Sequence, residues 1–334
     1  MLQARRQFLL CTGALLAAPF VEAQQATRMR RVSFVLSHSP LAEMAGLEPA
    51  HPILRAFVHE LRSLGYVEGR NLVLERRTAE GQLERYVDMF TELARLDTEV
   101  IVALGGYDPF KRACEAVSSI PVVMYGGSEP VKYGLARSLA HPGGNVTGLT
   151  YYTSPEVEAK RFQLLKEAVP ALARASYLVP KGFLEDVIVV AARHAAQAMR
   201  LELLFVEYAG RDFAEAFAAI EQQKPDALFA SPFPGIFASR QQVVRLARKA
   251  RLPDSYAHPE MAAAGGLMSY GINTPDLGRR AAHYVDRILK GAKPGDLAIE
   301  LPTKFDFVVN LGTARELGLK IPRSVLLGAD RVIE

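Results

Sequence analysis

Short apolar runs alternate with amphipathic segments along the chain from about residue 30 onward. The apolar runs are rich in β-branched residues and predict strands at 31–36, 71–75, 100–104 and 120–125. Between them, apolar positions recur at helical spacing and predict helices at 53–64, 83–96 and 110–117. Strands that alternate with helices are typical of parallel α/β layers. The first part of the chain therefore predicts a mostly parallel sheet flanked by helices.

The same pattern repeats after the Pro-Gly-Gly-Asn stretch at 142–145, which we interpret as the break between two blocks. Ser154 and Pro155 have the residue types of a helix start, and the helix is predicted to run to about residue 168. Strands are predicted at 175–179, 203–206 and 227–230. Helices are predicted at 187–199, 213–222 and 236–250. Two α/β blocks therefore stand side by side.

A third segment follows the second block, with a strand at 265–271, a helix at 275–289 and a strand at 305–309. Its position suggests that the chain crosses between the blocks at about 146–152, 268–274 and 299–305. We therefore predict a two-lobed α/β protein with a three-stranded hinge. The predicted N-terminal lobe comprises 29–148 plus 272–296, and the C-terminal lobe comprises 149–271 plus 297–334. A ligand would bind in the cleft, outside the carboxyl ends of the strands.

The first residues have the pattern of an export signal. Arg5 and Arg6 precede an uncharged apolar run at 8–20, and Ala23 ends a small-residue site that predicts cleavage of residues 1–23. The run is shorter than the roughly 20 residues that span a bilayer. An amphipathic first helix is the alternative, but the run has no polar face. The segment around the two arginines resembles a twin-arginine signal, and this route and the general secretory route both remain open. Either predicts a periplasmic protein.

Composition and charge narrow the class further. The chain has 334 residues, of which 49% are hydrophobic, and this is ample for a sizeable core. Its net charge is +4, and cleavage would remove two arginines and one glutamate, leaving +3. The basic residues do not cluster, so no nucleic-acid partner is predicted. Of the two cysteines only Cys114 would remain, and its place in a helical pattern favours a buried structural thiol.

The motifs of common catalytic sites are absent from the sequence. It contains no glycine-rich dinucleotide or phosphate-binding motif. The segment at 126–130 resembles a nucleophile elbow, but Pro130 replaces the second glycine that this turn requires. The seven histidines lack the spacing of metal ligands. We therefore expect no catalytic residue, no metal and no cofactor.

Polar and aromatic residues gather at the predicted strand ends and crossings, and these form the candidate ligand site. The candidates are Ser39, Tyr107, Asp108, Ser128, Glu129, Tyr151, Tyr152, Ser231, Phe233, His258, Glu260 and Tyr270.

Each candidate role has a structural alternative. Hydroxyls and helix starts of the first lobe would hold a carboxylate. Glu129 or Glu260 would pair with an ammonium, and the tyrosines would stack on an apolar or aromatic group. Alternatively, Asp108 is a helix cap, Ser128 and Glu129 form a turn, and the tyrosines pack in the hinge. The candidates are supported by their joint placement at the strand ends.

Several motifs resemble a known family. They are Leu64-Gly-Tyr-Val-Glu-Gly-Arg-Asn71, Leu139-Ala-His-Pro-Gly-Gly-Asn-Val-Thr-Gly148, Gly266-Leu-Met-Ser-Tyr-Gly271, Ile288-Leu-Lys-Gly-Ala-Lys-Pro294 and Leu317-Gly-Leu-Lys-Ile-Pro322. Through these motifs the chain resembles the tryptophan/tyrosine-type substrate-binding proteins of ABC importers. The resemblance implies a type I periplasmic binding fold and a small ligand such as an aromatic amino acid. The sequence departs from this family at 105–108 and 128–129, where members commonly have a Gly-Thr-Pro-like turn and a Gly-Asp pair. The resemblance therefore does not imply a tryptophan specificity.

The favoured hypothesis is therefore an exported solute-binding protein. It would capture a small carboxylate-bearing ligand by lobe closure and deliver it, as a monomer, to a membrane permease with its ATPase. The alternatives are an exported cofactor-dependent α/β enzyme, which a twin-arginine signal would suit, and a ligand-sensing partner of a membrane receptor.

Overall fold

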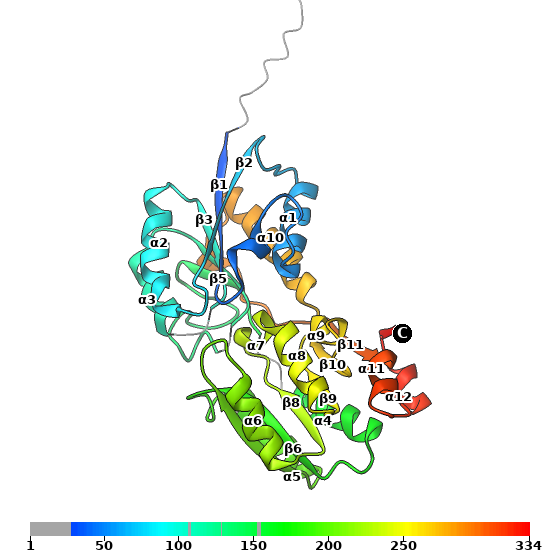
Figure 1. Cartoon of the computed structure of the whole chain (residues 1–334). Helices are drawn as coiled ribbons and strands as arrows, with labels where there is room; N and C mark the ends of the chain where they lie inside the picture. The colour runs from blue at the N-terminus through cyan, green and yellow to red at the C-terminus, as the bar shows by residue number, and fades with distance from the viewer. Residues whose placement is uncertain (1–27, 106–107, 128, 152–154) are drawn as a thin grey trace, which may run out of the picture.

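The computed structural model describes residues 28–105, 108–127, 129–151 and 155–334. It has two lobes, each built on its own sheet (Figure 1). The first sheet has the strand order β2-β1-β3-β4-β5, and all of its strands are parallel. Its strands are β1 (Arg30–Leu36), β2 (Leu72–Thr78), β3 (Val100–Ala103), β4 (Val122–Tyr125) and β5 (Val146–Leu149).

Helices cover both faces of the first sheet. Side chains that alternate along β1 point to opposite faces. Phe34 packs with α1 (Pro52–Ser63) and α10 (Thr274–Leu289), and Val35 packs with α2 (Tyr86–Arg95) and α3 (Asp108–Ala116). Figure 1 shows the orange α10 beside the blue α1, although more than 200 residues separate them in the sequence. Short 3-10 turns, η1 (Leu41–Met44), η2 (Leu83–Arg85) and η3 (Pro294–Asp296), complete this lobe.

The second sheet has the order β12-β11-β10-β9-β8-β6-β7, and only the β10–β11 pair is antiparallel. Its strands are β6 (Arg174–Pro180), β7 (Glu202–Tyr208), β8 (Ala227–Ala230), β9 (Asp254–Tyr256), β10 (Met268–Ile272), β11 (Phe305–Asn310) and β12 (Arg331–Ile333). Its helices are α4 (Pro155–Ala168), α5 (Val187–Ala198), α6 (Ala214–Gln223), α7 (Pro234–Ala238), α8 (Arg240–Lys249), α9 (Pro259–Ala263), α11 (Leu311–Glu316) and α12 (Arg323–Leu327). The two faces have separate apolar cores, one around α4 and α5 and the other around α6 and α8.

Three chain segments cross between the lobes and hydrogen-bond to one another. The backbone N–H of Thr150 donates to the carbonyl oxygen of Glu300, and that of Asn273 donates to Lys304, each at 3.0 Å. The Asn273 side chain also caps α10 by accepting from the Asp276 N–H. The predicted two-lobed fold with a three-stranded hinge is thereby confirmed.

Some of the predicted elements are wrong in detail. The Pro-Gly-Gly-Asn stretch at 142–145 does not separate the blocks, because β5 follows it and pairs with β4 in the first sheet. The chain leaves the first sheet only after Leu149. The helix predicted at 236–250 is two helices, α7 and α8, which meet at Ser239, where ψ is 20°. On the return, Glu300 still bridges to Leu149, a few residues past the predicted lobe boundary at 296/297.

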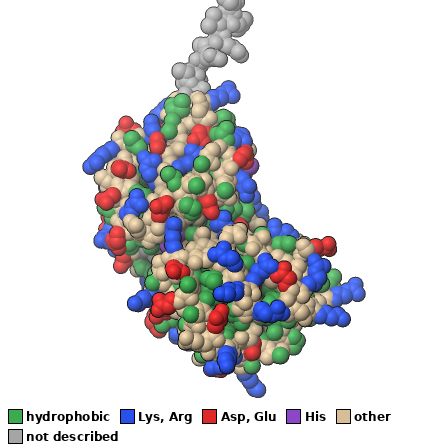
Figure 2. All heavy atoms as spheres, in the orientation of Figure 1, with side chains coloured by type: hydrophobic (Ala, Val, Ile, Leu, Met, Phe, Trp, Pro, Cys, Tyr) green, Lys and Arg blue, Asp and Glu red, His purple; other side chains and the backbone are tan. Residues whose placement is uncertain are grey.

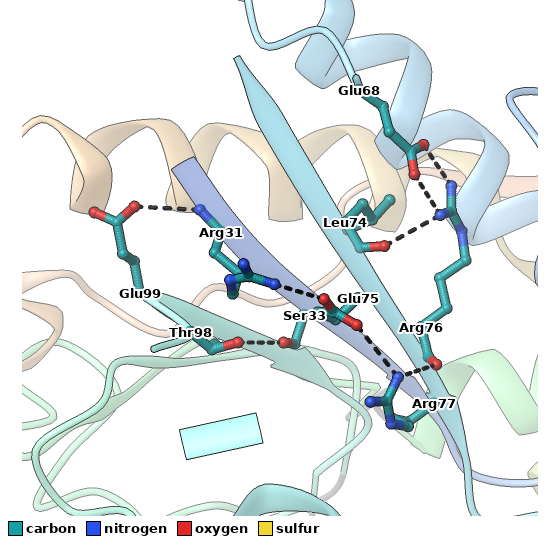
Figure 3. A network of polar contacts seen from close by, with 9 residues as sticks. All are labelled: Arg31, Ser33, Glu68, Leu74, Glu75, Arg76, Arg77, Thr98 and Glu99. Carbon is teal, nitrogen blue, oxygen red and sulfur yellow. Dashed lines mark hydrogen bonds and ion pairs between the residues drawn. The ribbon is translucent and has the colours of Figure 1, made fainter. Parts of the chain in front are cut away.

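Charged side chains occupy the exposed edge of the first sheet, on strand β2 (Figure 3). Arg76 donates to both carboxylate oxygens of Glu68, at 2.6 and 2.7 Å, and Arg31 donates to Glu75 at 2.7 Å. Charged residues on an edge strand oppose pairing with a strand of another molecule. The network therefore protects the β2 edge of the first sheet.

Among the described residues, no helix combines the length and apolar character that crossing a membrane requires. No three of their His, Cys, Asp or Glu side chains are grouped so that they could hold a metal ion. Figure 2 shows blue and red side chains interspersed over the visible face of both lobes. Cys114 is buried and free, as predicted, and burial raises the pKa of its thiol.

Candidate functional site

The cleft between the lobes contains three adjoining chambers. Chamber 1 is a cavity of about 30 Å³ between Ser37–Ser39, His51 and Thr274 on the first-lobe side and Pro232, Phe237 and His258 on the second. Chamber 2 has a volume of about 420 Å³ and lies between Glu80–Leu83 and the second-lobe segments 180–183, 208–211 and 233–235. Chamber 3, of about 50 Å³, lies between Gly127 and Tyr151 on one side and Glu158, Asp186 and Phe233 on the other.

The chambers lie at the carboxyl ends of parallel strands. Ser37 follows β1, Gly126 follows β4, and Ser231 follows β8 directly. This is the edge at which open α/β sheets bind ligands, because the loops from neighbouring strands converge there. Pro234 lines all three chambers, and His258 lines chambers 1 and 3, so the chambers are parts of one cleft.

Asp186 provides an unneutralised carboxylate in chamber 3. Its side chain caps α5 by accepting from the Ile188 N–H at 2.9 Å. Burial is the largest effect and raises the pKa of Asp186, and the charge of Glu129 adds to the rise, whereas the Ile188 N–H and the charge of Lys132 oppose it. Within the described part of the chain Asp186 forms no ion pair. A desolvated carboxylate in this position favours a cationic partner.

Chamber 3 contains a second carboxylate, that of Glu158, and the charge of Arg161 neutralises it. Glu158 lies one helical turn before Arg161 on α4, and their side chains are 2.9 Å apart and almost completely buried. Arg161 also donates to the carbonyl oxygen of Ala230 at 3.0 Å. Burial raises the pKa of Glu158, while the Arg161 charge opposes the rise. Chamber 3 therefore carries a net negative charge from Asp186.

Three histidines line chamber 1 and are neutral at neutral pH. Burial lowers the pKa of His38 and of His258 to about 4 and that of His51 to about 3. The charges of Arg211, Arg161 and Arg240, respectively, add to this effect. Neutral imidazoles can donate or accept a hydrogen bond without adding a charge.

Aromatic rings from both lobes form the apolar walls. Tyr151 lies against the backbone of Gly126, where a side chain would overlap its ring. Phe233 meets Phe183 at a centroid distance of 4.8 Å, and Phe237 meets His51 across the cleft at 5.6 Å. These rings offer an apolar surface to an aliphatic or aromatic ligand.

The structure brings four of the sequence candidates to the chambers. Ser39 lines chamber 1, Phe233 lines chambers 2 and 3, and Tyr151 and His258 line chambers 1 and 3. Ser231 lies directly beside them, and its hydroxyl is buried without a hydrogen-bond partner among the described residues. Tyr107, Ser128 and Tyr152 lie outside the described residues.

Four other candidates line none of the three chambers. Asp108 is exposed at the start of α3. Glu129 forms an ion pair with Lys132 at 2.8 Å. Glu260 accepts a hydrogen bond from Thr274, which itself lines chamber 1. Tyr270 packs on Phe305 and Phe307 beside the hinge.

Sequence reasoning missed Asp186, Glu158 and His51. Asp186 directly precedes a predicted helix in the loop after a predicted strand, so the rule applied to the other strand ends would have found it. Glu158 is placed within a helix, where a charged residue usually faces solvent, and no sequence signal distinguishes it. His51 precedes Pro52 at the start of α1, a helix start that faces the cleft only through the tertiary fold.

Comparison with known proteins shows what the chain is similar to. A sequence model described as ABC transporter substrate binding protein matches residues 50–333. A tyrosine-binding protein of Clostridioides difficile is 24% identical over 284 residues, which cover 84% of this chain and 80% of that protein.

Solved structures share the fold. An ABC domain of Streptococcus pneumoniae in complex with L-Trp superposes with a TM-score of 0.78 at 23% identity, covering 91% of this chain and 100% of that one. A conserved domain protein of Vibrio cholerae gives a TM-score of 0.77 at 24% identity, with the same coverage. At these identities the structures support a common fold.

Proposed function

The chain belongs to the family of ABC transporter substrate-binding proteins, and we propose that it captures an amino acid or aromatic acid in the interlobe cleft. The lobes would close on this solute, and the closed form would deliver it to a membrane permease and its ATPase. The protein would act as a periplasmic monomer after cleavage of residues 1–23, and without catalysis. The relatives that bind L-Trp and tyrosine support this solute class.

Chamber 3 is the observation that carries the proposal. It places the unneutralised carboxylate of Asp186 among apolar walls formed by Tyr151, Phe233 and Ile272. An amine would ion-pair with Asp186, while the apolar part of the solute would contact the rings. The hydroxyls of Ser37 and Ser39 in chamber 1 would donate hydrogen bonds to the solute's carboxylate. Both lobes contribute to these contacts, so closure would bury the solute.

Closure would follow from the differential contacts that a solute makes. A solute bound to one lobe gains the contacts of the other only in the closed form, so it shifts the equilibrium toward closure. The three hinge segments allow this motion because few backbone bonds join the lobes there.

Calorimetric titration of the mature chain with single amino acids and aromatic acids tests the proposal. We expect at least one to bind with a Kd on the order of 1 μM or tighter. Asp186→Asn should weaken an amine-bearing solute at least tenfold. Asp212→Asn is the matched control, because Asp212 accepts from a helix-start N–H in the same way, at 2.9 Å, but lines no chamber. Failure of every amino acid and aromatic acid to bind would disprove the proposed solute class.

A further inference from the structure

Chamber 2 is the roomiest part of the cleft, and the solute contacts proposed above leave it unused. Its volume of about 420 Å³ compares with about 50 Å³ for chamber 3 and 30 Å³ for chamber 1. Pockets for small ligands have volumes of about 300–1,000 Å³. The smaller chambers therefore hold only the head group of a solute, and its bulk must enter chamber 2.

The walls of chamber 2 suit a flat apolar group. Phe233 lines chambers 2 and 3, so a solute can pass along its ring from one to the other. Phe183 and Tyr208 add two further rings. Gly235 lies at this wall, and a side chain there would contact the Tyr208 hydroxyl. An aromatic side chain fits between such surfaces.

The charges of chamber 2 are opposite in sign to that of chamber 3. Lys181 and Arg211 line it together with a single carboxylate, Glu80. Arg211 donates to the carbonyl oxygen of His38 across the cleft. The ammonium of Lys181 has no ion-pair or hydrogen-bond partner in the part of the chain that the structure describes. A second anionic group would therefore be attracted here.

A single loop contributes charges of opposite sign to chambers 2 and 3. Lys181 and Asp186 stand at the two ends of the segment between β6 and α5, with Phe183 between them. Phe183 packs on Phe233, whose ring lines both the chamber with the cation and the chamber with the carboxylate.

We propose that chamber 2 is a side-chain subsite that selects an aromatic amino acid with an acidic group at the far end of its ring. The inference rests on the proposed function, because it places the solute's ammonium at Asp186. The ring would then lie along Phe233, and the distal acid would reach Lys181 and Arg211. The cations stand at the exposed rim, so the selection is modest and sensitive to salt.

A matched ligand pair tests this subsite. The mature chain is titrated by calorimetry with 4-carboxyphenylalanine and with 4-carbamoylphenylalanine, which has nearly the same shape but lacks the distal charge. We expect the carboxy compound to bind about three- to tenfold tighter at 0.05 M NaCl. The preference should shrink at 0.5 M NaCl, because salt screens exposed charges.

Two variants assign the preference to the chamber. Lys181→Gln with Arg211→Gln should abolish it, whereas Lys249→Gln, an exposed lysine outside the chambers, should preserve it. Equal binding of the two compounds, or a preference that survives in the double variant, would overturn the inference.

Tyrosine is titrated alongside to separate this outcome from the proposed function. Tyrosine binding that depends on Asp186, without a preference for the distal charge, would refute the subsite alone. If no amino acid or aromatic acid binds, both proposals fail.

Discussion

Arg240 of the second lobe forms an ion pair with Glu43 of the first, with 2.9 Å between Nη2 and Oε1. Both side chains are less than one-fifth exposed. The Arg240 guanidinium also lies over the ring of Phe237, which contacts His51 across the cleft. These contacts join the lobes across the cleft without any solute and stabilise the lobe arrangement of this structure.

Arg240→Gln should therefore open the cleft. The variant loses the ion pair and leaves Glu43 partly buried without its partner, which disfavours the closed form. Small-angle scattering should detect a larger radius of gyration, and solute affinity should fall about three- to tenfold. Arg248→Gln is the control, because its pair with Glu316 lies within the second lobe. An unchanged radius of gyration in R240Q would contradict the role of this contact.

Stability should fall on acidification because of the cleft histidines. His51 has a folded pKa of about 3, below the 6.5 of an unfolded histidine, so between these values the unfolded state binds the extra proton. The free energy of unfolding therefore falls progressively as the pH drops below 6.5. At pH 5 the loss is about 2 kcal/mol for this residue.

Urea unfolding at pH 7 and pH 5 measures this effect. His51→Gln should lose about 2 kcal/mol less than the wild type between the two pH values. His283→Gln, a histidine whose side chain is 55% exposed, should behave as the wild type. The same drop in stability for H51Q and the wild type would show that His51 is not the group responsible.

Gly126→Ala should impair binding more than folding. A methyl group there would overlap the ring of Tyr151 and displace it from the cleft wall. We expect the affinity for an aromatic amino acid to fall at least tenfold in calorimetry. Gly144→Ala has open space around it and should change neither affinity nor Tm. Wild-type affinity in G126A would mean that Tyr151 does not contact the solute.

Arg161→Met should destabilise the second lobe strongly. It would leave the Glu158 carboxylate buried without its cation, which costs about 3 kcal/mol or more. Adding Glu158→Leu should recover much of this loss, because it removes the unpaired charge and the rings of Tyr177 and Phe229 already pack on the Arg161 position. If the double variant is as unstable as R161M in urea unfolding, the cost arises from lost packing rather than from the unpaired charge.

Much of the fold could be predicted from the sequence because its elements have strong local signals. The strand Arg30–Leu36 and the helix Pro52–Ser63 are regular enough for periodicity to locate both within one residue. The end strand Arg331–Ile333 is short, and it was missed because three residues give no periodicity. The break at Ser239 was also missed, since neither glycine nor proline marks it.

The candidate site was less predictable because it combines segments far apart in the chain. Strand-end reasoning located Ser39, Phe233 and His258, whose loops follow predicted strands or precede a short helix. It could not locate Glu158, since a helix position gives no sign of facing a cavity. Tyr270 stands on a predicted crossing, but only the tertiary fold shows that its ring packs on β11.

A crystal structure of the mature chain with a bound aromatic amino acid is the decisive test of solute capture at Asp186. We predict that the solute lies between the lobes, with its ammonium about 3 Å from an Asp186 carboxylate oxygen and its ring along Phe233 toward chamber 2. A solute bound outside the cleft, or within it with the ammonium turned away from Asp186, would refute this binding mode.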